Sequence, residues 1–233
     1  MNALVIVPTY NEAENIEPLI KKIFGFISSS NVLIIDDNSP DGTGTIVEKI
    51  KEKDKRISVI HRERKLGLGS ACIEGFKFGI KNNYDLLITM DADFSHDPKD
   101  LPKFLEKINE GYDIVIASRY IKGGKIVNWG VYRKFTSKIA NTIKNYFLGL
   151  GVHDITTNYR AYKSTAIENI DLNKITSKGF SFLQDILYLA RKENLKIGEF
   201  PSVFVNRKFG KSKFSGNEIQ EFILSLLKTR FRM

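Results

Sequence analysis

The stretch Leu86–Ser95 reads LLITMDADFS, an apolar run that ends in two aspartates with one alanine between them. The run has the composition of a buried β-strand, so Asp91 and Asp93 would lie together where that strand ends. Like charges at that distance repel each other, and partial burial makes each of them costlier still. A positive charge must offset this cost, and the rest of the sequence indicates its nature.

Strand-like apolar runs alternate with helical patterns through the first half of the chain. We expect strands within residues 3–10, 31–43 (where the strand runs into a turn), 57–63, 84–93 and 113–120, with helices between them. Asn11 and Glu14 have the spacing of a capping box, which predicts that the first helix begins there. Short β-branched runs separated by helices predict an α/β fold, with a Rossmann-like, mostly parallel sheet flanked by helices.

The second half of the chain is organised differently. A glycine-rich loop, IKGGKIVNWG, precedes a long helix over about residues 132–148. A helix around FLQDILYLARKEN and a strand within IGEFPSVFV follow. The tail has the pattern of an amphipathic helix with a basic end. We therefore expect one domain over residues 1–215 and a basic amphipathic tail over residues 216–233, which would carry a membrane-surface contact.

Composition narrows the class of partner. The formal net charge is +9, which favours phosphorylated substrates, an anionic membrane or nucleic acid. The basic residues are scattered and match no nucleic-acid recognition pattern, so we expect no nucleic-acid partner. The single cysteine, Cys72, excludes an internal disulfide framework. The first residues lack a secretory signal, and no apolar run approaches the roughly 20 residues that a bilayer crossing needs.

Acidic residues follow three of the expected strands. Glu12 follows the first, Asp36 and Asp37 follow the second, and Asp91 and Asp93 follow the fourth. One such group alone is more typical of a turn or a helix cap, but a parallel sheet gathers all three at one edge. Mg²⁺ or Mn²⁺ binds few protein oxygens and completes its shell with substrate phosphates. The pattern therefore predicts a nucleotide diphosphate substrate bridged by a divalent cation.

A dinucleotide cofactor is the competing interpretation, and the glycines do not support it. The segment GLGSAC supplies G-x-G without the third glycine and follows the third strand. The first strand-to-helix turn, PTYNEAEN, contains no glycine, although a dinucleotide-binding turn requires it there.

Six segments together resemble a known family: IVPTYNE, IIDDNSPDGT, MDADFSHDP, SRYIKGG, WGVYRKFTSKIAN and GKSK. They resemble the dolichyl-phosphate mannose synthases, polyprenyl-phosphate glycosyltransferases of glycosyltransferase family 2 with the GT-A fold. The resemblance implies a catalytic domain over residues 1–215. It also implies inverting, metal-dependent transfer of a sugar from a nucleotide sugar to dolichyl or polyprenyl phosphate. Mannose from GDP-mannose is favoured, while UDP-glucose and UDP-N-acetylglucosamine stay open as donors.

The resemblance also implies site residues, carried over position by position. The nucleotide sugar would be bound by Pro8, Tyr10, Glu12, Asp37, Asp91, Ala92, Asp93, Arg207 and Lys213. The metal, Mg²⁺ or Mn²⁺, would be held by Asp91, Asp93 and Ser95, where Ser95 replaces a glutamine common in the family. The acceptor phosphate would be bound by Arg119, Arg133 and Ser137, and the catalytic residues would be Asp93, Arg119 and Arg133.

Two further departures from the family pattern occur, and the one at Asp185 keeps an alternative open. Asp185 stands where the family usually has glutamate, and Asn158 stands where it usually has glycine. Related enzymes that glycosylate hydroxyl groups use an aspartate in the region of Asp185 as general base. A hydroxyl acceptor with Asp185 as general base is therefore the second hypothesis.

The resemblance finally implies a membrane-bound acceptor. A chain without spans would act as a peripheral protein on the cytoplasmic face of the membrane. Lys228, Arg230 and Arg232 of the tail would attract anionic lipid. A separate small membrane subunit is a further partner that the resemblance suggests.

Overall fold

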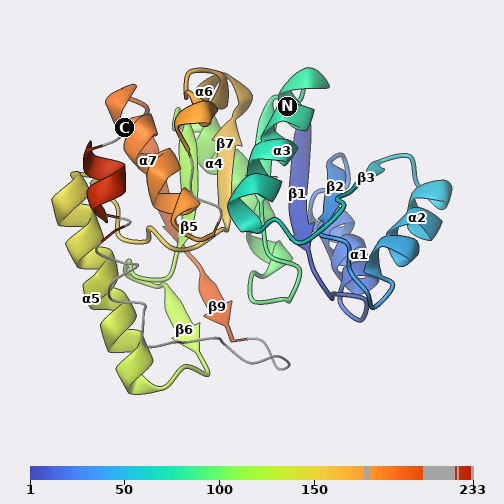
Figure 1. The fold of residues 1–233 in the computed structure, drawn as a ribbon, viewed down its shortest axis with the longest axis horizontal. Helices are drawn as coiled ribbons and strands as arrows, with labels where there is room; N and C mark the ends of the chain where they lie inside the picture. Colours follow the sequence, from blue (N-terminus) through green and yellow to red (C-terminus); the bar gives the residue numbers. More distant parts are fainter. Residues whose placement is uncertain (176–178, 207–223, 225, 232–233) are drawn as a thin grey trace.

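A computed structural model of the protein shows a central β-sheet with helices against both faces (Figure 1). The structure describes residues 1–175, 179–206, 224 and 226–231. The sheet has the strand order β3-β2-β1-β4-β7-β5-β8. Its strands are β1 (Ala3–Thr9), β2 (Asn31–Asp36), β3 (Ile57–His61), β4 (Leu86–Thr89), β5 (Ile114–Ser118), β7 (Arg160–Lys163) and β8 (Ile197–Pro201).

The sheet is mostly parallel, as the sequence predicted. β1 pairs in parallel with β2 and β4, β2 with β3, and β5 with β8. β7 runs antiparallel between β4 and β5. This inserted strand was not among the strands expected from the sequence. A second sheet pairs β6 (Lys125–Val127) in parallel with β9 (Val203–Val205).

Helices cover the two faces of the central sheet. The helices are α1 (Ile16–Phe26), α2 (Thr43–Lys53), α3 (Leu68–Lys81), α4 (Leu101–Asn109), α5 (Val131–Leu148), α6 (Ser164–Glu168) and α7 (Phe182–Lys192). Short 3₁₀ turns, η1 (Pro98–Asp100) and η2 (Leu172–Lys174), lie before α4 and before α7. Val5 and Val7 of β1 pack in the core cluster that includes α1 and α4, whereas Leu4 and Ile6 pack in the cluster that includes α3 and α7. Burial of each such side chain contributes about 1.5–3 kcal/mol.

Two local predictions are wrong. The helix expected from Asn11 begins at Ile16 instead. Asn11 has a left-handed backbone (φ 62°) and its N–H donates to Ser39 Oγ, so this segment is a loop bound to the β2–α2 connection. The single strand expected within IGEFPSVFV is divided between β8 and β9, which belong to different sheets.

Among the residues that the structure describes, no helix is both long and apolar enough to cross a membrane. A helical segment is present near the carboxyl end, at residues 224 and 226–231. Most of the predicted tail lies outside the described residues.

Candidate active site

The carboxyl ends of β1, β2 and β4 lie next to one another at one edge of the sheet. In the parallel register, Thr9 is opposite Asp36 and Ile6 is opposite Thr89. The loops that follow these strands therefore begin side by side. They carry Glu12, Asp37, Asp91 and Asp93, and Asp36 is the last residue of β2.

The loop after β1 presents an aromatic ring and a carboxylate at this edge. Pro8 is half-buried and Tyr10 is exposed, with Lys65 Nζ 3.9 Å from the centroid of the Tyr10 ring. Glu12 Oε2 accepts a hydrogen bond from Asn15 Nδ2 at 2.8 Å. The Lys65 ammonium lies within cation–π distance of the ring and adds a positive charge that the sequence motifs did not identify.

Asp37 is buried and holds the loop that follows β3. Its Oδ1 accepts from Arg62 Nη1 at 2.7 Å, and its Oδ2 accepts from the backbone N–H groups of Leu66 and Gly67 at 3.1 and 3.0 Å. Such charge-assisted bonds fix a loop firmly. Asp37 thus holds in place the loop that contains Lys65. Direct contact between Asp37 and a nucleotide stays a prediction.

The loop after β4 is held from both sides around Asp91. His96 Nδ1 accepts from the Asp91 N–H at 3.0 Å, and Asn158 Nδ2 donates to Asp91 Oδ1 at 3.0 Å. Burial lowers the pKa of His96 in spite of the neighbouring carboxylates, so the ring is neutral and Nδ1 is free of a proton. The ring stacks on Tyr159, with centroids 4.9 Å apart. Ala92, between the two aspartates, is buried.

The residues around Asp93 fit a hard divalent cation. Asp93 Oδ1 accepts from the Ser95 N–H at 3.0 Å, and Phe94 between them takes a left-handed backbone (φ 59°). The Ser95 hydroxyl is buried and has no hydrogen-bond partner among the described residues, which is costly for a polar atom. No group of three acidic, histidine or cysteine ligands occurs in the described part of the chain. Two carboxylates and one hydroxyl suit Mg²⁺ or Mn²⁺, which takes its remaining ligands from water and substrate.

Arg119 follows β5 and forms a buried ion pair with Asp154, a residue that was not predicted to belong to the site. Its Nε and Nη2 donate to Oδ2 and Oδ1 of Asp154, both at 2.7 Å, and Nη2 also donates to Thr156 Oγ1. Asp154 is fully buried. Burial alone would raise the pKa of Asp154, but the Arg119 guanidinium outweighs burial and holds that pKa below its ordinary value.

The glycines of SRYIKGG let the chain double back onto Arg119. A Cβ on Gly124 would lie 2.6 Å from the Ser118 carbonyl oxygen and 2.9 Å from that of Arg119. Gly123 has φ 95°, a conformation that other residues rarely adopt. The two glycines therefore place β6, and the start of α5 behind it, close to the end of β5.

Arg133 and Ser137 lie on the first turns of α5 and reach the same neighbourhood. The Arg133 guanidinium carbon is 3.9 Å from the centroid of the Trp129 ring, and the Arg119 guanidinium carbon is 5.9 Å from it. Ser137 Oγ is 2.7 Å from the hydroxyl of Tyr120. The structure thus gathers all three predicted acceptor residues around Trp129 and Tyr120.

Trp129 also ties this neighbourhood to the end of β9. Its Nε1 donates to Asn206 Oδ1 at 3.3 Å, and its ring packs edge-on against Phe204 at 5.6 Å. Phe204 in turn packs edge-on against His96 at 5.8 Å, which links the loop of Asp91 to the arginines. Arg207 and Lys213, which follow β9, lie outside the described residues.

Asp185 lies on α7 and contacts the helical segment near the carboxyl end. It is buried on α7, and its Oδ1 accepts a hydrogen bond from Thr229 Oγ1 at 2.5 Å. Thr229 in turn accepts from Gln184 Nε2. The helical segment near the carboxyl end therefore covers Asp185, and this placement gives no support to its role as general base.

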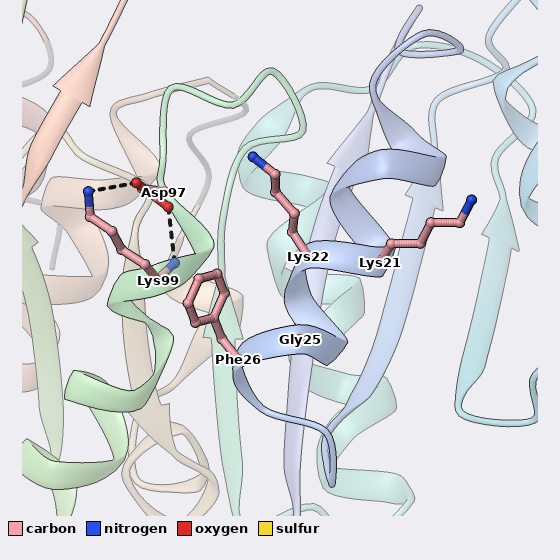
Figure 2. Close-up of a pocket in the computed structure, with 6 residues that line it drawn as sticks. All are labelled: Lys21, Lys22, Gly25, Phe26, Asp97 and Lys99. Carbon is pink, nitrogen blue, oxygen red and sulfur yellow. Dashed lines mark hydrogen bonds and ion pairs between the residues drawn. The ribbon is translucent and has the colours of Figure 1, made fainter.

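A hollow at the surface beside α1 contains none of the predicted site residues. Figure 2 shows it lined by Lys21, Lys22, Gly25, Phe26, Asp97 and Lys99. Lys21 is paired with Glu17 at 2.6 Å, and Lys99 is paired with Asp97 at 2.8 Å. Exposed pairs of this kind are typical of a solvated surface. The hollow therefore gives no reason to move the predicted site away from the carboxyl edge of the sheet.

Comparison with known proteins defines the class. Residues 4–171 match the protein family described as "Glycosyl transferase family 2". The chain belongs to this family and is a glycosyltransferase.

Two curated relatives are each 40% identical to the chain. One is a polyprenol monophosphomannose synthase of Mycolicibacterium smegmatis, aligned over 98% of this chain and 87% of the relative. The other is an undecaprenyl-phosphate mannosyltransferase of Micrococcus luteus, aligned over 98% of this chain and 93% of the relative.

Solved structures confirm the fold. A glucosyl-3-phosphoglycerate synthase of Mycobacterium tuberculosis, in complex with Mn²⁺ and UDP, has a TM-score of 0.67 at 16% identity, over 98% of this chain and 79% of that one. A mannosyltransferase of Pyrobaculum calidifontis, in complex with GDP-mannose and Mn²⁺, has a TM-score of 0.67 at 16% identity. The match covers 100% of this chain and 64% of that one. At these identities the similarity establishes the GT-A fold and nothing finer.

Proposed function

We propose that this protein transfers mannose from GDP-mannose to a polyprenyl or dolichyl phosphate, with inversion and with a divalent cation. The observation that carries the proposal is the 40% identity, over nearly the whole chain, to two relatives named for mannose transfer to polyprenyl carriers. The geometry is compatible with it, because ring contacts connect the two proposed substrate sides. His96, in the loop of Asp91, contacts Phe204, Phe204 contacts Trp129, and Trp129 lies against Arg133.

On the donor side, Pro8, Tyr10, Glu12 and Asp37 would bind the nucleoside, and Asp91 and Asp93 would face the diphosphate. Asp91, Asp93 and Ser95 would hold Mg²⁺ or Mn²⁺, which neutralises charge on the departing diphosphate. The buried hydroxyl of Ser95 would then gain a partner, directly or through a water molecule. Arg207 and Lys213, which lie outside the described residues, would bind the nucleotide sugar by resemblance alone.

On the acceptor side, the nucleophile needs placement more than a base. A phosphate monoester is largely dianionic at neutral pH, because its second pKa is about 6. Arg133 and Ser137 would bind it by charge-assisted hydrogen bonds and hold it against repulsion from the donor diphosphate. Arg119 would contribute its charge from a position fixed by Asp154. No protein carboxylate need accept a proton in this scheme.

The remaining assignments follow from the lipid acceptor. The catalytic domain would span residues 1–215, and residues 216–233 would contribute to contact with the cytoplasmic membrane surface. A separate small membrane subunit stays a prediction from the resemblance.

The test is transfer of label into lipid. The purified chain is incubated with polyprenyl phosphate, Mg²⁺ or Mn²⁺, and labelled GDP-mannose, UDP-glucose or UDP-N-acetylglucosamine in turn. We expect label in the chloroform phase with GDP-mannose, in the opposite anomeric configuration to the donor. We expect EDTA or Asp93→Asn to reduce the rate by about 10³-fold, the loss of several kcal/mol of charge stabilisation.

Absence of lipid-linked label with every donor would refute the proposal. Transfer to a hydroxyl acceptor that Asp185→Asn abolishes would favour the alternative chemistry instead.

A further inference from the structure

Helix α5 turns polar side chains toward the domain. The inner face carries Arg133, Ser137 and Asn141, at intervals of four residues. Asn141 Oδ1 accepts from the Ile155 N–H at 2.8 Å, and Ser137 Oγ contacts the Tyr120 hydroxyl. Asn141 and Leu148 are the buried residues of the helix. A helix on the surface of a soluble domain normally buries its apolar stripe and exposes its polar one, so this arrangement is reversed.

The outer face of α5 is apolar and uncovered in the described structure. Of the sixteen large apolar side chains exposed among the described residues, seven lie on this helix: Val131, Tyr132, Phe135, Ile139, Ile143, Tyr146 and Phe147. Tyr132 is 80% exposed and Tyr146 is 91% exposed. They recur at the three- and four-residue spacing that places side chains on one helix face. A contiguous patch of this kind marks a surface for a partner.

The charge of α5 indicates the chemistry of that partner. The helix contains four basic residues and no acidic one. Arg133 belongs to the inner face and Lys144 interacts with Asp185 of α7, which leaves Lys134 and Lys138. Lys134 and Lys138 are one turn apart, between the inner polar face and the outer apolar face. An apolar face bordered by basic residues, with no negative charge, is complementary to an anionic lipid surface.

We propose that α5 is the membrane-docking element of this protein, with Phe135, Ile139, Ile143 and Tyr146 entering the headgroup region of an anionic bilayer. The helix has 18 residues and lies along the rim of the molecule, with the domain on one side only (Figure 1). Lys134 and Lys138 then meet headgroup phosphates, while Arg133 faces the site. This inference rests on the proposed function, since it explains how an acceptor phosphate held in a bilayer reaches Arg133.

A second copy of the chain is a poorer occupant of the same face. In a two-fold dimer the same patch meets itself, so Lys134 and Lys138 of each α5 would lie near their counterparts, and neither helix has an acidic side chain. Their repulsion opposes the apolar contact. A bilayer supplies the counter-charge that a second α5 lacks.

The test measures sedimentation of the full chain with vesicles that contain no polyprenyl phosphate. One set is phosphatidylcholine alone, and the other is equal parts phosphatidylcholine and phosphatidylglycerol. We expect tighter binding to the anionic vesicles, and about a thirtyfold or greater loss of binding in the variant Phe135→Ser/Ile139→Ser. Phe26→Ser, at an exposed phenylalanine of α1, is the matched control and retains wild-type binding.

A second variant keeps the test decisive if the first one is unstable. Lys134→Gln/Lys138→Gln is expected to lose about tenfold or more in binding to anionic vesicles and almost nothing on phosphatidylcholine, because each basic residue contributes about 1 kcal/mol at an anionic surface. Equal binding by the wild type and by both α5 variants would overturn the proposal, as would an equal loss in Phe26→Ser.

Other results also decide between occupants. A wild-type dimer that Phe135→Ser/Ile139→Ser dissociates, without vesicle binding, would assign the face to a second copy and overturn the proposal. Because the vesicles contain neither donor nor acceptor, the outcome is independent of transfer. A chain that binds vesicles through α5 but transfers no sugar would refute the proposed function alone.

Discussion

The end of β5 and the first turns of α5 each supply one arginine to the predicted acceptor site, in opposite surroundings. Arg119 is buried, with three of its donor bonds taken by Asp154 and Thr156. Arg133 is half-buried and lies over the Trp129 ring on a helix that exposes most of its length. Two arginines predicted for one site can thus differ in burial and in bonding, because their tertiary contacts differ. We infer that Arg119 supplies fixed charge and structure, and that Arg133 makes the adaptable contact.

The largest expected effect tests Arg119 as a structural residue. Arg119→Met leaves the buried Asp154 carboxylate without its partner, which should lower the free energy of unfolding by about 3–5 kcal/mol. Arg133→Met removes a half-buried stacking contact and should cost about 1 kcal/mol or less. Urea denaturation of both variants measures the difference. Arg119→Met/Asp154→Asn removes both charges and should recover part of the loss.

The pH dependence provides an independent check on the same pair. Because the pKa of Asp154 is lowered in the folded state, its contribution to stability is complete above about pH 4 and is lost as pH falls through the lowered pKa. The double variant should lack this loss. Equal stability of Arg119→Met and Arg133→Met would contradict the contrast between the two regions.

An intermediate effect tests Arg133 as the acceptor contact. Arg133→Ala should raise the KM for the acceptor by about 10–100-fold, the loss of hydrogen bonds to a charged group, while the KM for GDP-mannose changes little. Arg133→Lys should recover part of the loss, because lysine keeps the charge but not the planar fork. A short, water-soluble isoprenyl phosphate serves as acceptor, so that membrane binding does not enter the measurement.

The control for this experiment lies on the same helix. Lys138→Gln removes an exposed charge of α5 and should leave both KM values unchanged with the soluble acceptor. A similar rise in Lys138→Gln would show that net charge, not the Arg133 contact, governs acceptor binding.

The donor edge could be predicted from sequence because one rule determines it. Once the runs ending at Thr9, Asp36 and Thr89 are interpreted as parallel strands, their registers bring Glu12, Asp91 and their neighbours to one edge. Periodicity and the shared edge of parallel strands suffice for that step. The capping-box prediction failed at this same edge, because Asn11 hydrogen bonds to Ser39 of another loop rather than to its own helix.

The acceptor side could not be predicted in the same way. Its defining contacts join residues far apart in sequence: Arg119 with Asp154, and Trp129 with Asn206. Neither pair follows a periodic pattern, and the antiparallel strand β7, which begins shortly after Asp154, was not expected from the sequence. The resemblance identified the arginines, but only the structure shows which partner each of them has.

The smallest expected effect tests how firmly the donor edge is held. Asn158, buried beside β7, donates to Asp91 Oδ1 at a position where the resemblance predicted glycine. Asn158→Gly removes one hydrogen bond to a carboxylate that remains partly exposed, so the expected loss is about 1 kcal/mol, or roughly fivefold in affinity for Mn²⁺ with GDP-mannose. Calorimetric titration measures it, and urea denaturation separates it from loss of folding.

Asn158→Asp replaces the neutral amide by a negatively charged carboxylate of nearly the same volume. A second carboxylate beside Asp91 repels it when the metal is absent, so donor binding without metal should weaken further than in Asn158→Gly. An added metal ion would offset that repulsion and narrow the gap between the two variants. If both variants bound the donor as the wild type does, with or without Mn²⁺, the amide of Asn158 would have no part in orienting Asp91. The rigidity of the donor edge would then depend on the backbone bond to His96.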